Sequence, residues 1–165
     1  MSELREIFRA IFRRHVAGVS VITFTLEGEL GGLTATSVIS VAAAPPTIAF
    51  AVSRHSGAGQ AIKRVERVVV NFLDDGQSEL AGRFASRGTP RFDVDSYHLT
   101  DAGLPVLQAA SGWLAARIVA RHEVADSFLV VAEVEKIWVD EDAEVRPLVY
   151  LDRHYRELAP ITKET

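Results

Sequence analysis

The sequence contains no cysteine, one methionine and two tryptophans among its 165 residues. The absence of cysteine excludes disulfide frameworks, zinc sites built on thiolates, and cysteine nucleophiles. Basic residues are not in excess either, because 18 lysines and arginines against 22 aspartates and glutamates give a net charge of 18 − 22 = −4. Proteins that bind nucleic acid usually carry a positive surface that displaces counterions from the phosphates. Nucleic acid is therefore not expected as a partner.

Long hydrophobic runs are also scarce. The longest nearly uncharged run, residues 31–53, is long enough to cross a membrane, but threonines, serines and the pair Pro45-Pro46 interrupt it, so we expect no membrane span. The charged first six residues lack the apolar stretch and cleavage site of a signal peptide, which predicts a cytoplasmic protein. The length and the hydrophobic share of 48% predict a single domain over residues 1–165.

The common catalytic signatures are missing too. There is no Gly-x-Gly-x-x-Gly, no Walker lysine loop and no Gly-x-Ser-x-Gly elbow, which removes the main support for dinucleotide folds, nucleoside triphosphatases and serine hydrolases of those kinds. The five histidines form no His-x-x-x-His pair. We interpret the neighbouring Asp93, Asp95 and His98 as a solvated turn, so no metal site is expected.

Hydrophobic periodicity predicts a mainly β protein. Apolar residues at helical spacing indicate an amphipathic helix over residues 3–14, with Arg5, Arg9 and Arg13 on its solvated face. The remaining patterns predict about seven strands and two further short helices, which makes three helices in all and favours an antiparallel barrel over a doubly wound parallel sheet. The strands are expected over 16–26, 30–41, 47–52, 68–73, 113–122, 128–139 and 147–151, and the two further helices over 56–63 and 77–84.

Residues 85–112 interrupt this regular pattern. Gly88, Pro90, Gly103 and Pro105 leave no continuous helical or strand period in the segment. Long excursions inside a small domain are often functional. We therefore expect a ligand to bind beneath this segment.

The most unusual segment runs from Gly31 to Val41, where two adjacent glycines and several small hydroxyl residues stand in an otherwise apolar strand region. Small residues let a flat ligand approach the backbone, whose N–H groups and neighbouring hydroxyls can hydrogen-bond ring heteroatoms. A threonine-rich edge strand without a ligand is the open alternative. Residues 53–60 add a cation and a hydroxyl before a helix start, which favours a phosphate. With residues 71–73 and 84–88 they describe a pocket for a flat heteroaromatic ring with a phosphate tail.

Eight segments in a fixed order carry a resemblance to a known family. They are residues 12–23, 32–38, 45–46, 71–73, Gln77, 80–81, 84–85 and 147–155. Together they resemble the flavin reductase-like domain, and the resemblance extends from about Phe8 to Leu158. It implies an FMN-binding split barrel that forms a homodimer. It also implies an NAD(P)H:flavin oxidoreductase, in which NADH or NADPH passes a hydride to N5 of FMN or FAD and the reduced flavin serves a partner monooxygenase.

The resemblance also assigns flavin-binding residues by position, with no catalytic acid or base among them. The assigned residues are Thr34, Ala35, Thr36 and Ser37 along the flavin ring; Asn71, Phe72 and Leu73 beside it; Ser53, Arg54 and Ser56 near the phosphate; Phe84, Ala85 and Ser86 closing the pocket; and Tyr150, Arg153 and Tyr155 at its C-terminal border.

One position departs from the family pattern. Members commonly have Gly-Asp-His before the strand expected at 128–139, with the histidine facing the nicotinamide, whereas this chain has Ala125-Asp126-Ser127. Ser127 is therefore the nicotinamide-site candidate. Hydride transfer depends on stacking and electrostatics more than on a protein acid or base, so a reductase stays the first hypothesis. The alternatives are a flavin- or heme-binding carrier or redox sensor without turnover, and a barrel for an apolar metabolite.

Overall fold

The computed structural model describes residues 2–159, which form twelve strands and three helices. The helices are α1 (Ser2–Phe12), α2 (Gly57–Ile62) and α3 (Ser78–Ala85). The strands are β1 (Ala17–Gly18), β2 (Ser20–Leu26), β3 (Glu29–Ala35), β4 (Ile39–Ala43), β5 (Pro46–Ser53), β6 (Arg67–Phe72), β7 (Tyr97–Leu99), β8 (Pro105–Leu107), β9 (Gly112–Val124), β10 (Ser127–Val139), β11 (Val149–Leu151) and β12 (His154–Arg156).

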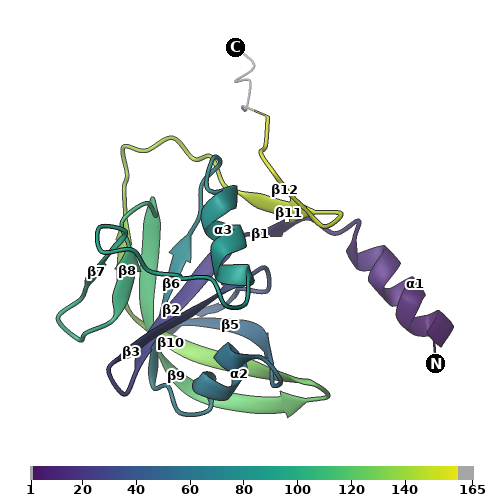
Figure 1. Ribbon diagram of the computed structural model, residues 1–165, viewed down its shortest axis with the longest axis horizontal. Coiled ribbons are helices and arrows are strands. Elements are labelled where there is room, and N and C mark those ends of the chain that lie inside the picture. Colours follow the sequence, from purple (N-terminus) through teal and green to yellow (C-terminus); the bar gives the residue numbers. More distant parts are fainter. Residues whose placement is uncertain (1, 160–165) are drawn as a thin grey trace.

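Seven of these strands form one antiparallel sheet in the order β3-β2-β6-β9-β10-β5-β4. The sheet wraps around its main core, because Phe24 of β2, Phe50 of β5 and Val130 of β10 belong to one buried cluster although β2 and β5 are not neighbours in the sheet (Figure 1). The edge strands β3 and β4 are not hydrogen-bonded to each other, so the roll stays open between them. The expectation of a mainly β, antiparallel fold is confirmed.

Short strands account for the differences from the sequence-based expectation. The pair β7 and β8 lies within residues 85–112, and β12 forms a hairpin with β11, which in turn pairs with β1. Each of these strands has two or three residues. Because an alternating pattern needs about four residues to be recognised, the sequence alone could not separate β7, β8 and β12 from loops. Strands β1 and β11 lie within the strands expected over 16–26 and 147–151.

The excursion over residues 85–112 is fastened to the main sheet. Thr25 of β2 donates a hydrogen bond to the carbonyl of Gly103 at 2.7 Å, and the backbone N–H of Leu107 donates to Asn71 Oδ1 at 2.9 Å. Val106 is buried in a small cluster beneath the excursion. Core side chains therefore fill part of the space beneath the excursion, and a pocket of about 240 Å³ between the excursion and Trp113 remains, so ligand binding there stays a prediction.

Helix α1 stands away from the sheets (Figure 1). It ends at Phe12, two residues before the expected boundary, because residues 13–15 form a turn. The large apolar side chains of one helix face remain more than half exposed: they are Leu4, Ile7, Phe8, Ile11 and Phe12. None of the helices within residues 2–159 combines the length and the apolar character needed to cross a bilayer.

Candidate functional site

The segment Thr34–Ser37 is held at both of its ends. The Thr34 hydroxyl donates to the carbonyl of Ala81 in α3 at 2.5 Å. The Ser37 hydroxyl accepts a hydrogen bond from the Ala51 N–H at 2.9 Å and donates to the Ala51 carbonyl at 3.2 Å. Because Ile39 pairs with Ala49 in the β4–β5 ladder, position 37 faces position 51, and the Ser37 side chain extends that ladder. The segment therefore bridges α3 and β5.

Thr36 occupies the middle of this bridge with its side chain exposed. Within residues 2–159, neither the Thr36 hydroxyl nor the backbone of Thr36 or Ser37 takes part in the hydrogen bonds that lie outside the strand ladders. Polar backbone groups with no protein partner hydrogen-bond water or a ligand. The sequence-predicted position Thr36 thus presents donors and acceptors at the surface.

Ser53, Arg54 and Ser127 meet at the far end of β5. Ser53 and Ser127 are partners in the β5–β10 ladder, and the Arg54 N–H donates to the Asp126 carbonyl at 2.9 Å. Arg54 Nη1 lies 2.8 Å from Glu123 Oε2, whereas Arg54 Nε is buried without a hydrogen-bond partner in the described chain. A buried donor without a partner is costly, so Nε marks a place where an anion would be stabilised.

The Ser56 hydroxyl has a structural partner at each side. It accepts from the Gly59 N–H at 2.9 Å and donates to the Ser53 carbonyl at 2.9 Å, which makes Ser56 the N-cap of α2. A Cβ on Gly59 would lie 1.9 Å from the Ser53 carbonyl oxygen, so the helix packs directly on β5. This capping fixes the position of Ser53 and Arg54 beside it.

Three of the expected flavin residues are interior side chains. The Asn71 amide donates to the Val21 carbonyl at 3.0 Å and to Thr23 Oγ1 at 3.1 Å, and its oxygen accepts from the Leu107 N–H. Leu73 and Phe84 are buried in the cluster beside α3. These side chains support the walls around the candidate site and have no free polar atoms to offer a ligand.

Phe72 has the opposite orientation and is 41% exposed. It lines an apolar groove of about 400 Å³ that includes Val38 and Ile39, directly after Ser37 in the chain. The full lining of this apolar groove is Val38, Ile39, Ser40, Ala42, Ala43, Pro46, Thr47, Ile48, Phe72, Leu114, Val134 and Ile137. Phe72 therefore places an aromatic surface next to the Thr34–Ser37 segment.

The adjacent glycines Gly31 and Gly32 have a packing role that differs from the one expected. A Cβ at Gly31 would lie 2.3 Å from the Phe24 ring, and one at Gly32 would lie 2.8 Å from the Phe84 ring and 2.9 Å from the Ile22 carbonyl oxygen. The interpretation that both glycines admit a flat ligand to the backbone is therefore wrong. Core aromatic rings occupy that space.

Tyr150 and Tyr155 are in contact at the C-terminal border, with ring centroids 5.3 Å apart and ring planes tilted by 58°, and both pack against the cluster that contains Phe84. Burial raises the pKa of the Tyr155 hydroxyl, and the neighbouring Tyr150 raises it further, so Tyr155 stays protonated at neutral pH. Ala85 and Ser86 are exposed at the end of α3, where the Ser86 hydroxyl donates to the Gly82 carbonyl at 2.8 Å. Ser86 thus contributes to the helix end.

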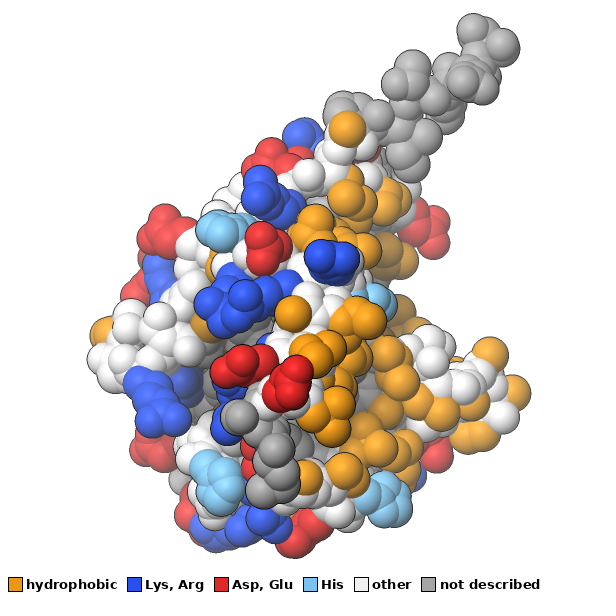
Figure 2. Space-filling model, turned by 90° about the vertical axis from the view of Figure 1, so that its right-hand side faces the viewer, with side chains coloured by type: hydrophobic (Ala, Val, Ile, Leu, Met, Phe, Trp, Pro, Cys, Tyr) orange, Lys and Arg blue, Asp and Glu red, His pale blue; other side chains and the backbone are white. Residues whose placement is uncertain are grey.

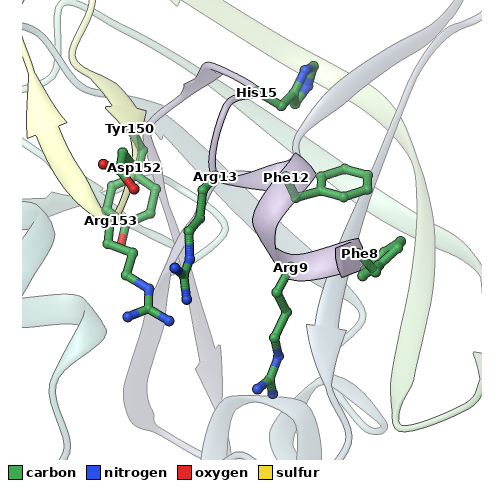
Figure 3. A pocket seen from close by; sticks show the side chains of 8 residues that line it. All are labelled: Phe8, Arg9, Phe12, Arg13, His15, Tyr150, Asp152 and Arg153. Atoms are coloured by element: carbon green, nitrogen blue, oxygen red, sulfur yellow. The ribbon is translucent and has the colours of Figure 1, made fainter. Parts of the chain in front are cut away.

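Arg153 lines a pocket of about 290 Å³ together with Arg9 of α1 and Arg13 of the turn that follows α1 (Figure 3). This arginine pocket is lined by Phe8, Arg9, Phe12, Arg13, His15, Tyr150, Asp152 and Arg153. The sequence predicts Arg9 and Arg13 on one solvated helix face, because they are four residues apart, but their spacing does not show that they line a pocket with Arg153.

Comparison of the chain with known proteins identifies its family. The model of the flavin reductase-like domain matches residues 12–159. The chain belongs to the flavin reductase-like domain family.

Similar proteins extend over almost the entire flavin reductase-like chain. An NADH:FMN oxidoreductase of Rhodococcus qingshengii is 34% identical over 157 residues, which cover 93% of this chain and 82% of that protein. The crystal structure of a flavin reductase domain protein from Arthrobacter sp. FB24 matches with 37% identity and a TM-score of 0.89, covering 98% of this chain and 99% of that one. Nitrilotriacetate monooxygenase component B from Mycobacterium thermoresistibile matches with 25% identity and a TM-score of 0.90, covering 99% and 91%.

Proposed function

We propose that this flavin reductase-like protein reduces FMN with NADH. The observation that carries this proposal is the similarity to an NADH:FMN oxidoreductase at 34% identity over 93% of the chain, within a family whose model covers residues 12–159. The proposal treats residues 1–165 as one domain of this family. NADPH as cosubstrate and FAD as flavin remain outcomes of the assay below.

The residues present fit a flavin. Thr36 offers an exposed hydroxyl and backbone groups for the ring, and Phe72 offers an aromatic surface nearby. Ser53 follows Ala51, the partner of Ser37, by two residues, or about 7 Å along the strand. The Nε of Arg54, which has no hydrogen-bond partner in the described chain, supports a phosphate position beside Ser53. We propose that the Thr36 hydroxyl and the backbone groups of Thr36 and Ser37 orient the ring, and that Ser53 and Arg54 hold the phosphate.

Bound FMN would supply the hydride-accepting N5 atom. The chain's own contribution is to position the nicotinamide and exclude water. Ser127, paired with Ser53, has its hydroxyl 3.1 Å from Asp126 Oδ1, to which it donates. Because Ser127 has no charge in the neutral pH range, we propose that it shapes the nicotinamide site without acting as an acid or base.

The decisive experiment is a steady-state assay of NADH and NADPH oxidation with added FMN or FAD. We expect NADH oxidation that depends on the flavin. Flavin binding, measured by fluorescence quenching, without any nicotinamide oxidation above background would replace the reductase with a flavin carrier or redox sensor. If the protein binds no flavin, the hypothesis of a barrel that binds an apolar metabolite would replace both.

We propose a homodimer as the working assembly. Two apolar surfaces of the chain are uncovered: the face of α1 and the apolar groove, where Ile39 and Ile137 are 57% and 62% exposed. Figure 2 shows hydrophobic side chains gathered in a band down the face of the molecule from which α1 extends. Apolar surfaces of this extent usually mark interfaces, and two copies of the chain can cover them reciprocally.

A monooxygenase is the partner that we propose for the reduced flavin. The support is the similarity to nitrilotriacetate monooxygenase component B. The cytoplasmic location expected from the charged N-terminal segment belongs to the same proposal, because both proteins would have to share one compartment.

A further inference from the structure

Three guanidinium groups gather in the arginine pocket, at the C-terminal border of the flavin-site residues. Figure 3 shows Arg9, Arg13 and Arg153 extending toward the same side of this pocket, while the rings of Phe8 and Phe12 point away from them. Arg9 comes from α1, Arg13 from the turn that follows it and Arg153 from the β11–β12 turn, so the cluster exists because the end of the helix and the hairpin turn lie side by side.

A backbone hydrogen bond joins the turn after α1 to the β11–β12 hairpin. The N–H of Asp152 donates to the carbonyl of Arg13 at 2.9 Å, just beyond the end of α1. Asp152 and Arg153 have φ angles of 49° and 64°, a left-handed conformation that side chains larger than glycine adopt infrequently. Hairpin turns of this kind favour glycine at the second position. Backbone strain of this kind is found mainly at functional sites, so the strained conformation of Arg153 points to a function of its side chain.

The three arginines of the pocket have no ion-pair partner in the part of the chain that the structure describes. Several other arginines of the described chain are paired with carboxylates, for example Arg67 with Glu135 and Arg83 with Asp93, whereas exposed arginines such as Arg5 and Arg14 are not. Within residues 2–159 no ion pair involves Arg9, Arg13 or Arg153, although the acidic Asp152 belongs to the lining. Like charges that are held together without partners create a positive potential, which attracts an anion.

We propose that the arginine pocket binds the phosphate groups of the nicotinamide dinucleotide. This inference rests on the proposed reductase function. Guanidinium groups bind phosphate oxygens in pairs, and a volume of about 290 Å³ is small for a whole dinucleotide but suits its phosphates with part of a sugar. The flavin phosphate has its own candidate partner in Arg54, so the second ligand that carries phosphate is the cosubstrate.

The test compares the double variant Arg13→Gln/Arg153→Gln with the control Arg5→Gln. Arg5 lies one turn before Arg9 on the same helix face and does not line the pocket. The glutamine variants keep the backbone bond between Arg13 and Asp152. For the double variant we expect the KM for NADH to rise at least about tenfold, with kcat within about twofold of wild type, because charge-assisted bonds to phosphate are lost. A loss of FMN affinity of the same size would instead assign Arg153 to the flavin, as the family resemblance implies, and would overturn the proposal.

Isothermal titration calorimetry with ADP and with 2′,5′-ADP measures nucleotide affinity independently of turnover. We expect both to bind wild type and Arg5→Gln, and to bind the double variant at least about tenfold more weakly. An equal loss for the two probes assigns the pocket to the diphosphate side, and a larger loss for 2′,5′-ADP assigns it to the 2′-phosphate of NADPH.

Two different failures can be told apart. If wild type reduces FMN with NADH but the folded double variant keeps both its KM and its ADP affinity, the arginine pocket is overturned while the reductase function stands. If wild type oxidises no nicotinamide, the proposed function fails. ADP titration then still decides whether the pocket binds a nucleotide.

Discussion

Hydroxyl and amide side chains of this protein divide into those that build the walls of the site and those that face its surface. Asn71 uses its amide donors and its oxygen within the core, and Ser56 caps α2. Ser37 joins the end of β3 to β5. Thr36 lies between these residues, is exposed, and its hydroxyl makes no hydrogen bond within the described chain. Ligand binding and stability should therefore separate at adjacent residues.

Thr36→Leu and Ser37→Ala test this separation. We expect Thr36→Leu to lower FMN affinity at least about tenfold without changing the free energy of unfolding, because the leucine removes a donor and obstructs the ring. Ser37→Ala should instead lower the free energy of unfolding by about 1 kcal/mol through the lost bonds to Ala51. Fluorescence titration and urea unfolding of both variants measure the two quantities. Equal FMN affinity in Thr36→Leu and wild type would place the ring elsewhere.

At the level of elements, the contact between β3 and its neighbours depends on residues without side chains. The Phe84 ring of α3 lies where a Cβ on Gly32 of β3 would project, so the helix and the strand pack at backbone distance. Thr34 reinforces this contact through its bond to Ala81. The position of α3, and with it the border of the candidate site, follows from this packing.

Gly32→Ala should lower the free energy of unfolding by about 1–3 kcal/mol, because the added methyl group meets both the Phe84 ring and the Ile22 carbonyl. Gly57→Ala is the matched control, since a Cβ there meets nothing within 4 Å in the helix α2. Urea unfolding followed by circular dichroism compares the two variants. Equal stability of Gly32→Ala and wild type would contradict the close packing.

Charged side chains connect β6, β9 and β10 on the surface of the main sheet. Arg67 of β6 lies 2.9 Å and Arg117 of β9 lies 3.4 Å from the Glu135 carboxylate of β10. The hydrogen bond from Arg67 holds the pKa of Glu135 below its ordinary value of 4.5 and raises the pKa of Arg67. The stabilisation by this pair is therefore present above pH 4.5 and is lost as the pH falls through the lowered pKa.

Glu135→Gln should remove part of the acid sensitivity of the fold. We expect the urea midpoint of wild type to fall more steeply than that of Glu135→Gln when the pH is lowered below 4.5, because the glutamine takes up no proton. Glu141→Gln, at an exposed turn position outside the ion pairs of the described chain, should follow wild type. Parallel curves for wild type and Glu135→Gln would show that the ion pair adds no stability in water.

On the scale of the whole molecule, the apolar face of α1 and the apolar groove are the surfaces that one chain does not cover. Interfaces of standard size bury about 800 Å² on each partner, so the helix face and the groove together are the natural contributors. Reciprocal exchange between two copies would cover both surfaces. Arg9 and Arg13 extend away from the rings of Phe8 and Phe12 and would stay available for a phosphate (Figure 3).

Sedimentation equilibrium at micromolar concentration should give twice the chain mass of 18.0 kDa. Ile7→Glu/Ile11→Glu should shift the protein toward monomer, because burying two carboxylates in an apolar interface is costly. Val94→Glu, at a position that is 90% exposed in the excursion, is the control and should remain a dimer. A monomer mass for wild type would overturn the homodimer.

The sequence by itself determined the mainly β class, the long pair of strands β9 and β10, the amphipathic character of α1 and the membership of the family, because periodicity and ordered motifs are properties of short segments. Only the tertiary structure decided which hydroxyls are free. The partners of Thr34 and Ser37 lie 47 and 14 residues away, and strand register selects them. The proximity of Arg13 and Arg153 likewise depends on the hydrogen bond between Arg13, just after α1, and Asp152 of the last hairpin, a contact between distant parts of the chain that no local pattern contains.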